Sequence, residues 1–367
     1  MEPDLPLRRL VIKGFRGIRE LELPELAQVN LFVGSNNAGK SSVLEAIRLF
    51  VEADYWYRLR AALEIVQSHS DLRLQSSSGS RGPVDGAALE EALAAVQGLF
   101  YTHDGGDSSY RAQIGGDLGS TSALHLSIPV FEKPDSDSGD ASPPEPLSPR
   151  SRVLRLRVGD RATFSHLSAI LRPPIAGRRE SLPRAQYIGS TGLTNGALRT
   201  LWSRVTLAGR ESDVESALRI LLPDLERVSQ IADVGQGGIV LKLNTTSRPV
   251  SLQSMGDGVV RVFGIAAAMV LAQGGVLLID EIENGLHHTV QAEVWSALFR
   301  YAEDLDVQVF ATTHSWEAVD AFQKAAAESA LEGMLYRLDR KEDGSVRAVR
   351  YSEREVAIAA EQQIEVR

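Results

Sequence analysis

The sequence contains no cysteine, and this absence excludes disulfide scaffolding, thiolate catalysis and cysteine-ligated zinc. It also lacks any run that approaches the roughly 18 consecutive apolar residues of a membrane span. The first residues, MEPDLP, have neither the basic start nor the apolar run of a signal peptide. The sequence therefore predicts a cytoplasmic protein without a membrane segment.

The sequence has fewer basic than acidic residues. Lysine and arginine number 39 against 48 acidic residues, which gives a net charge of −9. This balance argues against nonspecific coating of nucleic acid, although a local basic patch could still bind it. At about 100–200 residues per domain, the 367 residues predict two or three structural units around at least one sizeable core.

Hydrophobic periodicity predicts strands near the N-terminus. Arg9–Lys13 and Leu21–Leu23 alternate between apolar and polar residues, and Val29–Val33 is a nearly continuous apolar run suited to a buried strand. A glycine-rich turn follows, and Lys40–Phe50 then shows the apolar spacing of a helix.

The middle of the chain carries weaker signals. Residues 132–151 (EKPDSDSGDASPPEPLSPRS) can bury too little apolar surface to offset ordering entropy, so we expect a flexible loop, as a plain insertion rather than a phosphorylated tail. Residues 153–158 predict a strand, and 197–230 predict a helical stretch interrupted at Pro223. No sustained heptads occur in the middle of the chain, which excludes a long coiled coil.

The turn after the buried strand fits the pattern G-x-x-x-x-G-K-[S/T]. Its glycines let backbone N–H groups converge on phosphate oxygens, and the start of the following helix adds a favourable dipole. Lys40 would reach the β- and γ-phosphates of ATP, and Ser41 would ligate Mg²⁺. An ordinary Gly/Asn turn is the alternative. The predicted nucleotide contacts are Gly34, Ser35, Asn36, Asn37, Ala38, Gly39, Lys40, Ser41 and Ser42.

A second apolar strand, Gly275–Ile279, ends in two carboxylates. In a parallel sheet this end of the strand is where α/β folds bind ligands. Asp280 suits contact with Mg²⁺, direct or through water, and Glu281 suits a base that orients and polarises the attacking water. Glu283 is either a second acid or a solvated turn carboxylate, and its place in the turn favours the latter.

Two further elements narrow the class of site. Ser254–Gly258 opens a long apolar helix, and such a turn is either an anion site or an ordinary helix cap. Val307–Thr313 has the pattern of a strand, and we expect His314, at its end, to lie beside the other strand ends within reach of the γ-phosphate. His287 and His288 lack a third ligand at metal spacing, which favours a turn or a subunit contact over zinc.

In their order along the chain these segments resemble the ATP-binding-cassette (ABC) superfamily, in its SMC/RecF-like branch of chromosome-associated proteins. The nearest likeness is to the OLD-like (overcoming-lysogenisation-defect) group of bacterial AAA-type ATPases. Residues 51–180 carry little of the likeness. The matching segments are Ile12–Ile18, Gly34–Ser42, Ser254–Gly258, Leu278–His287 and Ala311–Ser315, with Tyr187–Thr191 and Ile364–Arg367 as further matches.

The resemblance implies an α/β fold, namely a P-loop NTPase of ABC-ATPase type. Its central, mostly parallel sheet carries helices, and an N-terminal antiparallel β lobe and a helical insertion lobe complete it. Residues 1–60 would form the N-terminal half of the head, 61–250 the insertion lobe and 251–367 the C-terminal half. Within the last part, residues 334–338 and 346–351 predict a β-hairpin, followed by a short helix.

The resemblance also implies a homodimer whose heads meet head-to-tail around two ATPs. In each site, one subunit would supply the phosphate loop, Asp280, Glu281 and His314, and its partner would supply Ser254 and Gly256.

Three features depart from the family pattern or match it incompletely. The signature turn is Ser-Met-Gly-Asp-Gly rather than Ser-Gly-Gly-Gln, so its contacts stay open. Gln67 is a candidate for the family's Q-loop glutamine, without a motif around it. Arg16 matches an arginine near the nucleotide in related heads, and a solvated arginine at a strand end is the alternative.

Full-length OLD proteins continue into a Toprim nuclease domain, and the chain after His314 is too short to hold one. We therefore expect a stand-alone ATPase. Members of this kind often act beside a separate effector, such as a nuclease, in anti-phage defence. The resemblance implies a partner protein of this type.

Two functions stay open. The first is an ATPase switch that controls a separate effector in phage defence. The second is an ATPase of DNA repair or chromosome maintenance that binds DNA directly. A transporter subunit fits less well, because Phe15–Gly17 and Asn284–His287 resemble the OLD branch instead. The basic residues that would either contact DNA phosphates or line a solvated loop are Arg172, Arg178, Arg179 and Arg184.

Overall fold

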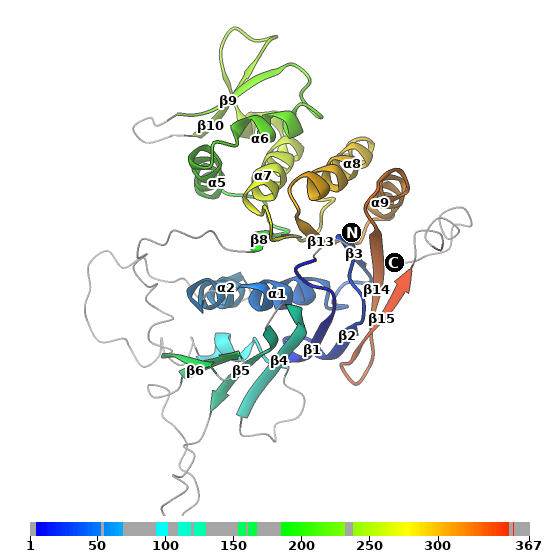
Figure 1. The fold of residues 1–367 in the computed structure, drawn as a ribbon. Helices are drawn as coiled ribbons and strands as arrows, with labels where there is room; N and C mark the ends of the chain where they lie inside the picture. Colours follow the sequence, from blue (N-terminus) through cyan, green and yellow to red (C-terminus); the bar gives the residue numbers. More distant parts are fainter. Residues whose placement is uncertain are drawn as a thin grey trace, which may run out of the picture.

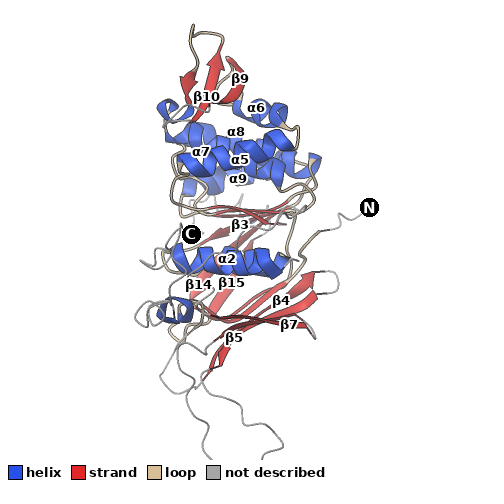
Figure 2. Ribbon diagram, turned by 90° about the vertical axis from the view of Figure 1, so that its left-hand side faces the viewer, coloured by secondary structure: helices blue, strands red, loops and turns tan. Residues whose placement is uncertain are grey.

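The molecule is built in layers of sheet and helix. The computed structural model describes residues 5–52, 55–68, 93–101, 109–118, 121–129, 153–158, 161–166, 185–231, 238–351 and 355. An antiparallel sheet, a helical layer, a central sheet, a second helical layer and a small sheet follow one another along the molecule (Figure 2).

The central sheet is mostly parallel, as predicted. Its strand order is β15-β14-β3-β13-β12-β8, and every pair is parallel except the hairpin of β14 and β15. All residues of β3, β12 and β13 are buried, because helices cover both faces of the sheet. The strands are β3 (Val29–Val33), β8 (Ala185–Ile188), β12 (Val276–Ile279), β13 (Gln308–Thr312), β14 (Gly333–Arg340) and β15 (Val346–Tyr351).

Helices lie on both faces of this sheet (Figure 1). Helices α1 (Lys40–Val51) and α2 (Tyr55–Ser68) separate it from the antiparallel sheet. The opposite face carries α5 (Asn195–Leu207), α7 (Asp257–Leu271), α8 (His288–Asp304) and α9 (Trp316–Glu328), with α6 (Glu211–Leu218) packed on α7.

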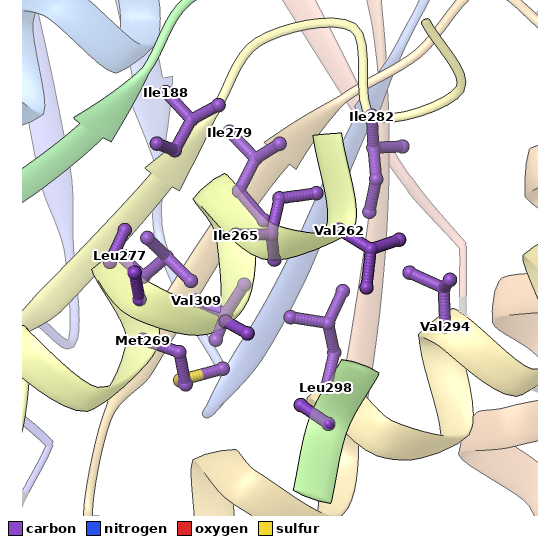
Figure 3. Packing of buried hydrophobic residues seen from close by; sticks show 14 of the residues in the cluster. Ile188, Val262, Ile265, Met269, Leu277, Ile279, Ile282, Val294, Leu298 and Val309 are labelled. Carbon is purple, nitrogen blue, oxygen red and sulfur yellow. The ribbon is translucent and has the colours of Figure 1, made fainter. Parts of the chain in front are cut away.

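Helix α7 is the centre of the larger hydrophobic core. Its side chains Val262, Ile265 and Met269 pack against Leu277 and Ile279 of β12 (Figure 3). Every residue of α7 from Arg261 onward is buried. The apolar run after the signature turn is therefore a core helix, and only its first turn reaches the surface.

The antiparallel sheet confirms the predicted N-terminal β lobe and the strand at residues 153–158. Its order is β2-β1-β4-β5-β6-β7, with antiparallel neighbours throughout. The strands are β1 (Leu10–Phe15), β2 (Ile18–Leu23), β4 (Ser109–Leu118), β5 (Thr121–Pro129), β6 (Val153–Val158) and β7 (Arg161–His166).

The prediction of helix throughout residues 197–230 is wrong after Pro223. Helices α5 and α6 occupy its first part, but Leu225–Ile231 forms strand β9. This strand pairs with β10 (Gly238–Leu243), which also pairs with β11 (Val250–Ser251). Proline does not continue a helix. The strand conformation after it is stabilised by pairing with β10, whose residues follow later in the chain.

Of the remaining predictions on the middle and the end of the chain, one is confirmed and the others are not tested. The hairpin of β14 and β15 is confirmed. The loop 132–151 and the short terminal helix lie outside the described residues. The division at residues 60 and 250 stays a prediction. Residues 61–250 contribute strands to all three sheets. No helix in the described part of the chain is long and apolar enough to cross a membrane.

Candidate nucleotide-binding site

The phosphate loop, Gly34–Gly39, connects β3 to α1. Gly34, Asn37 and Gly39 all have positive φ, at 142°, 66° and 98°. At Gly34 a Cβ atom would lie 2.4 Å from the Leu338 carbonyl oxygen of β14, so only glycine fits there. Helix α1 starts without a side-chain cap or an acidic residue in its first turn. Its first amides therefore suit an anion such as phosphate.

The Lys40 side chain folds back onto the carbonyl oxygens of the phosphate loop. Its Nζ donates hydrogen bonds to the carbonyl oxygens of Gly34 at 2.7 Å and Ser35 at 3.0 Å. Burial lowers the pKa of the Lys40 ammonium, while the charges of Asp280, Glu281 and Glu283 oppose that shift. The ammonium thus lies against the loop with three carboxylates near it.

Ser41 and Asp280 meet at the start of α1. The Ser41 hydroxyl donates to Asp280 Oδ1 at 3.1 Å, and the Thr312 hydroxyl donates to the same oxygen at 2.6 Å. Strand β13, which carries Thr312, lies between β3 and β12. The predicted adjacency of the three strand ends is therefore confirmed. A hydroxyl and a carboxylate are oxygen ligands of the kind that Mg²⁺ takes, so the pair fits this ion.

The next residue, Glu281, has a left-handed backbone conformation, with φ of 49°. Its N–H donates to the Thr312 hydroxyl at 2.8 Å, and its Oε2 accepts from the Asn284 amide at 2.6 Å. The side chain is 34% exposed. A non-glycine residue with this φ is strained. Thr312 anchors its main chain and Asn284 anchors its carboxylate, which stays open to water.

Glu283 is not a solvated turn carboxylate, and that expectation is wrong. Only 9% of its side chain is exposed, and its Oε1 accepts a hydrogen bond from the His314 backbone N–H at 2.9 Å. The His314 ring lies near both glutamates, with Nδ1 3.1 Å from Glu283 Oε1 and 3.9 Å from Glu281 Oε1. The end of β13 carries His314 to the same sheet edge as Glu281, as predicted.

Arg261 is a part of this region that the sequence analysis missed. Its guanidinium is buried and donates to the carbonyl oxygens of Gly189, Asp280 and Glu281. Burial lowers the pKa of Arg261, and Asp280 is the carboxylate that most opposes the shift. A single charge inside the apolar sequence VVRVFGIAAAMV was the available signal, because buried arginine needs partners.

The signature turn lies on the surface. Ser254 Oγ donates to the Ser251 carbonyl oxygen at 2.7 Å, and Gly256 has φ of 92° with no heavy atom within 4 Å of a built Cβ. At Gly258, by contrast, a Cβ would lie 2.8 Å from the Gly285 carbonyl oxygen. Within the described residues, no hydrogen bond joins Ser254 or Gly256 to the phosphate loop.

Arg16 also has positive φ, at 49°, and lies between β1 and β2. Its Nε is 3.2 Å from Glu45 Oε2 on α1, so it is paired across the two layers rather than solvated. Arg340 of β14 donates to the Asn37 side-chain oxygen at 3.2 Å and thus contacts the phosphate loop. Gln67 lies in α2, and the basic run Arg172–Arg184 lies outside the described residues.

The rings of His287 and His288 are in tilted contact at the start of α8, with centroids 4.1 Å apart and 38° between their planes. His287 Nδ1 accepts from the Thr289 N–H and caps the helix. In the described part of the chain, no group of three or more histidine, aspartate or glutamate residues could hold a metal ion.

The fold is similar to that of SMC head domains. The head of an SMC protein bound to the C-winged helix domain of ScpA has a TM-score of 0.50 and 13% identity, over 95% of this chain and 98% of that one. An SMC head with an extended coiled coil, bound to the C-terminal domain of ScpA from Pyrococcus furiosus, also scores 0.50, at 11% identity over 98% of this chain and 99% of that one. The predicted fold class is confirmed.

The chain belongs to the family described as "AAA domain, putative AbiEii toxin, Type IV TA system", whose model matches residues 29–320. It therefore carries the ATPase domain of that family. The OLD-like group, which is narrower, is not distinguished by this match.

Curated proteins are similar to the chain over segments of different length. An ATP/GTP phosphatase of Helicobacter pylori is 21% identical over 347 residues, which cover 86% of this chain and 87% of that protein. Two uncharacterised proteins of Methanocaldococcus jannaschii match shorter segments. MJECL11 is 34% identical over 87 residues, 23% of this chain and 75% of that protein. MJECL10 is 56% identical over 48 residues, and the match spans only 22% of its length.

Proposed function

We propose that this protein hydrolyses ATP with Mg²⁺ at the edge where β3, β13 and β12 end. The observation that carries the proposal is the 3.1 Å contact between Ser41 Oγ and Asp280 Oδ1, which joins the phosphate loop to the acidic strand end. Family membership and the SMC-head fold support the same activity.

Each residue has a distinct role in this proposal. The amides of Gly34–Ser42 and the Lys40 ammonium bind the phosphates, which draws Lys40 away from the loop carbonyls. Ser41 and Asp280 would hold Mg²⁺, which would supply positive charge to neutralise the transferring phosphoryl group. Glu281 orients the attacking water and accepts its proton, and its partial exposure supports that role. His314 contacts the γ-phosphate, and Arg16 lies at the nucleotide's edge.

The experiment is phosphate release as a function of Mg²⁺ concentration. Asp280→Asn keeps the shape of the side chain but removes its charge. We therefore expect the Mg²⁺ concentration that gives half of the maximal rate to rise at least about tenfold. Asp320→Asn, on the exposed face of α9, is the matched control and should leave it unchanged. Equal Mg²⁺ dependence in wild type and Asp280→Asn would contradict the proposed metal site.

The working form in this proposal is a homodimer. Ser254 and Gly256 are exposed, and the open space around Gly256 supports contact with a second molecule. No side chain caps the start of α7, so its first amides and positive dipole end suit the γ-phosphate of a nucleotide bound to the partner, although the charge of Asp257 in the same turn opposes this. Two identical surfaces would close around two ATPs by twofold symmetry.

The dimer would act as an OLD-like switch for a separate effector in anti-phage defence. The family description names a toxin of a type IV toxin–antitoxin system, which supports a defence role. The SMC heads of similar fold are bound to domains of ScpA, which supports a protein partner. Co-expression with the product of a neighbouring gene tests this. ATP-dependent co-elution is expected, and elution apart with and without ATP would contradict it.

A DNA-repair ATPase is the second candidate, and the SMC-head fold is the observation that favours it. Duplex DNA added to the turnover assay separates the two functions. Stimulation by DNA supports the second candidate, and unchanged turnover supports the switch.

A further inference from the structure

Among the described residues, the buried carboxylate of Glu283 has its closest polar contacts with His314. A single oxygen, Oε1, accepts the His314 backbone N–H at 2.9 Å and lies 3.1 Å from Nδ1 of the ring. The two residues come from different strand ends, 31 positions apart in sequence. This carboxylate thus fixes both the main chain and the ring of His314.

The second oxygen of the Glu283 carboxylate lies in an unfavourable environment. Glu283 Oε2 is buried and has no hydrogen-bond partner among the described residues. An unpartnered buried oxygen on a carboxylate is unfavourable, and an apolar residue of similar volume would avoid the cost. Packing alone therefore does not account for a glutamate here.

The contact has a defined chemical consequence for the imidazole. A carboxylate that faces Nδ1 favours a proton on Nδ1, and when Nε2 also carries a proton its N–H can donate to an anionic oxygen. The side chain of His314 is 49% exposed, so Nε2 can be reached from solvent. Glu281 also lies near the ring, with Oε1 3.9 Å from Nδ1.

We propose that Glu283 is a positioning residue, which accepts the Nδ1–H of His314 and thereby directs the Nε2–H of the imidazolium form toward the γ-phosphate. The inference rests on the proposed ATPase function, and it separates the roles of the two glutamates. Glu281 is open to water and suits the base, whereas Glu283 is buried against the ring and acts through His314.

The first test uses the unmodified protein without nucleotide. Long-range proton–nitrogen correlation spectra of ¹⁵N-labelled protein report which ring nitrogen carries the proton, and the signals missing in His314→Gln assign the ring. We expect His314 to carry its proton on Nδ1. A ring in the Nε2–H form would overturn the proposal, whether or not the protein hydrolyses ATP.

The second test compares two replacements of Glu283. Glu283→Met fills a similar volume without an acceptor, and we expect kcat to fall by about 10- to 100-fold with KM for ATP unchanged. Glu283→Gln keeps an acceptor oxygen and should recover most of that loss. Glu293→Met, on an exposed position of α8, is the control and should match wild type. Equal turnover in Glu283→Met and wild type would overturn the proposal.

A double-mutant cycle excludes a merely structural role. In the His314→Gln background, Glu283→Met should cause no further loss of kcat, because its effect passes through the ring. An equal loss in both backgrounds would overturn the inference and leave the proposed ATPase intact. Absence of turnover in wild type would instead refute the ATPase, and the ring spectra would still decide the role of Glu283.

Discussion

The guanidinium of Arg261 donates to the main-chain carbonyl oxygen of Asp280 at 2.6 Å. The same side chain also binds the carbonyl oxygens of Glu281 and Gly189. Arg261 stands one turn into α7 from the signature, so one residue connects the first turn of that helix to the acidic end of β12. The strained backbone of Glu281 is thus held from two sides, by Arg261 and by the Thr312 hydroxyl.

Arg261→Met should destabilise the protein. The change removes the donor to the carbonyl oxygens of Gly189 and Asp280 and one of the two donors to that of Glu281, and we expect the free energy of unfolding to fall by about 2–4 kcal/mol. Urea denaturation measures it. Arg300→Met, on α8, is the control and should stay within about 0.5 kcal/mol of wild type. If both variants unfold at the same urea concentration, Arg261 does not hold the strand end.

Motifs with short, fixed spacing were predictable from the sequence. The strand, glycine loop and helix around Lys40 are contiguous, and each strand that ends in a motif could be placed by its apolar run. The burial of Glu283 could not be foreseen, because its partner His314 lies 31 positions away. Strand β9 was missed for a similar reason, since its pairing with β10 is settled by tertiary contact rather than by local pattern.

ATP affinity should depend on pH through Lys40. Burial lowers the pKa of this ammonium below 10.5, and bound phosphates favour the charged form and raise the pKa again. Affinity should therefore be full below the lowered pKa and fall as pH rises through it. Calorimetry at pH 8 and above measures this loss, because the γ-phosphate is already ionised there.

Lys40→Met serves as the reference. It should bind ATP about 1.5–3 kcal/mol more weakly near neutral pH and lack the alkaline loss. Equal affinity in the two proteins, or the same alkaline loss in both, would show that Lys40 does not contact the phosphates.

Complementation between two inactive chains tests the shared site. Lys40→Ala damages the phosphate loop, and Gly256→Glu places charge in the open space at the signature. A mixed dimer keeps one site with both parts intact. Random pairing at equal amounts should therefore restore about a quarter of wild-type activity.

Gly274→Glu is the matched control for Gly256→Glu. Gly274 also has positive φ and open space, but it lies after the far end of α7. This variant should stay active. That result would show that Gly256→Glu acts through the signature and not through backbone strain. A mixture that stays inactive despite proven mixed dimers would contradict the shared site, as would turnover by a protein that light scattering shows to be monomeric with ATP.

The most direct test of the ATPase mechanism is single-turnover hydrolysis by Glu281→Gln. The amide keeps the shape of the side chain and the contact with Asn284, but it cannot accept the proton of the attacking water. We expect ATP affinity to be retained, hydrolysis to slow by about 100-fold or more, and an ATP-loaded dimer to accumulate. Hydrolysis at the wild-type rate would contradict the account and place the base elsewhere.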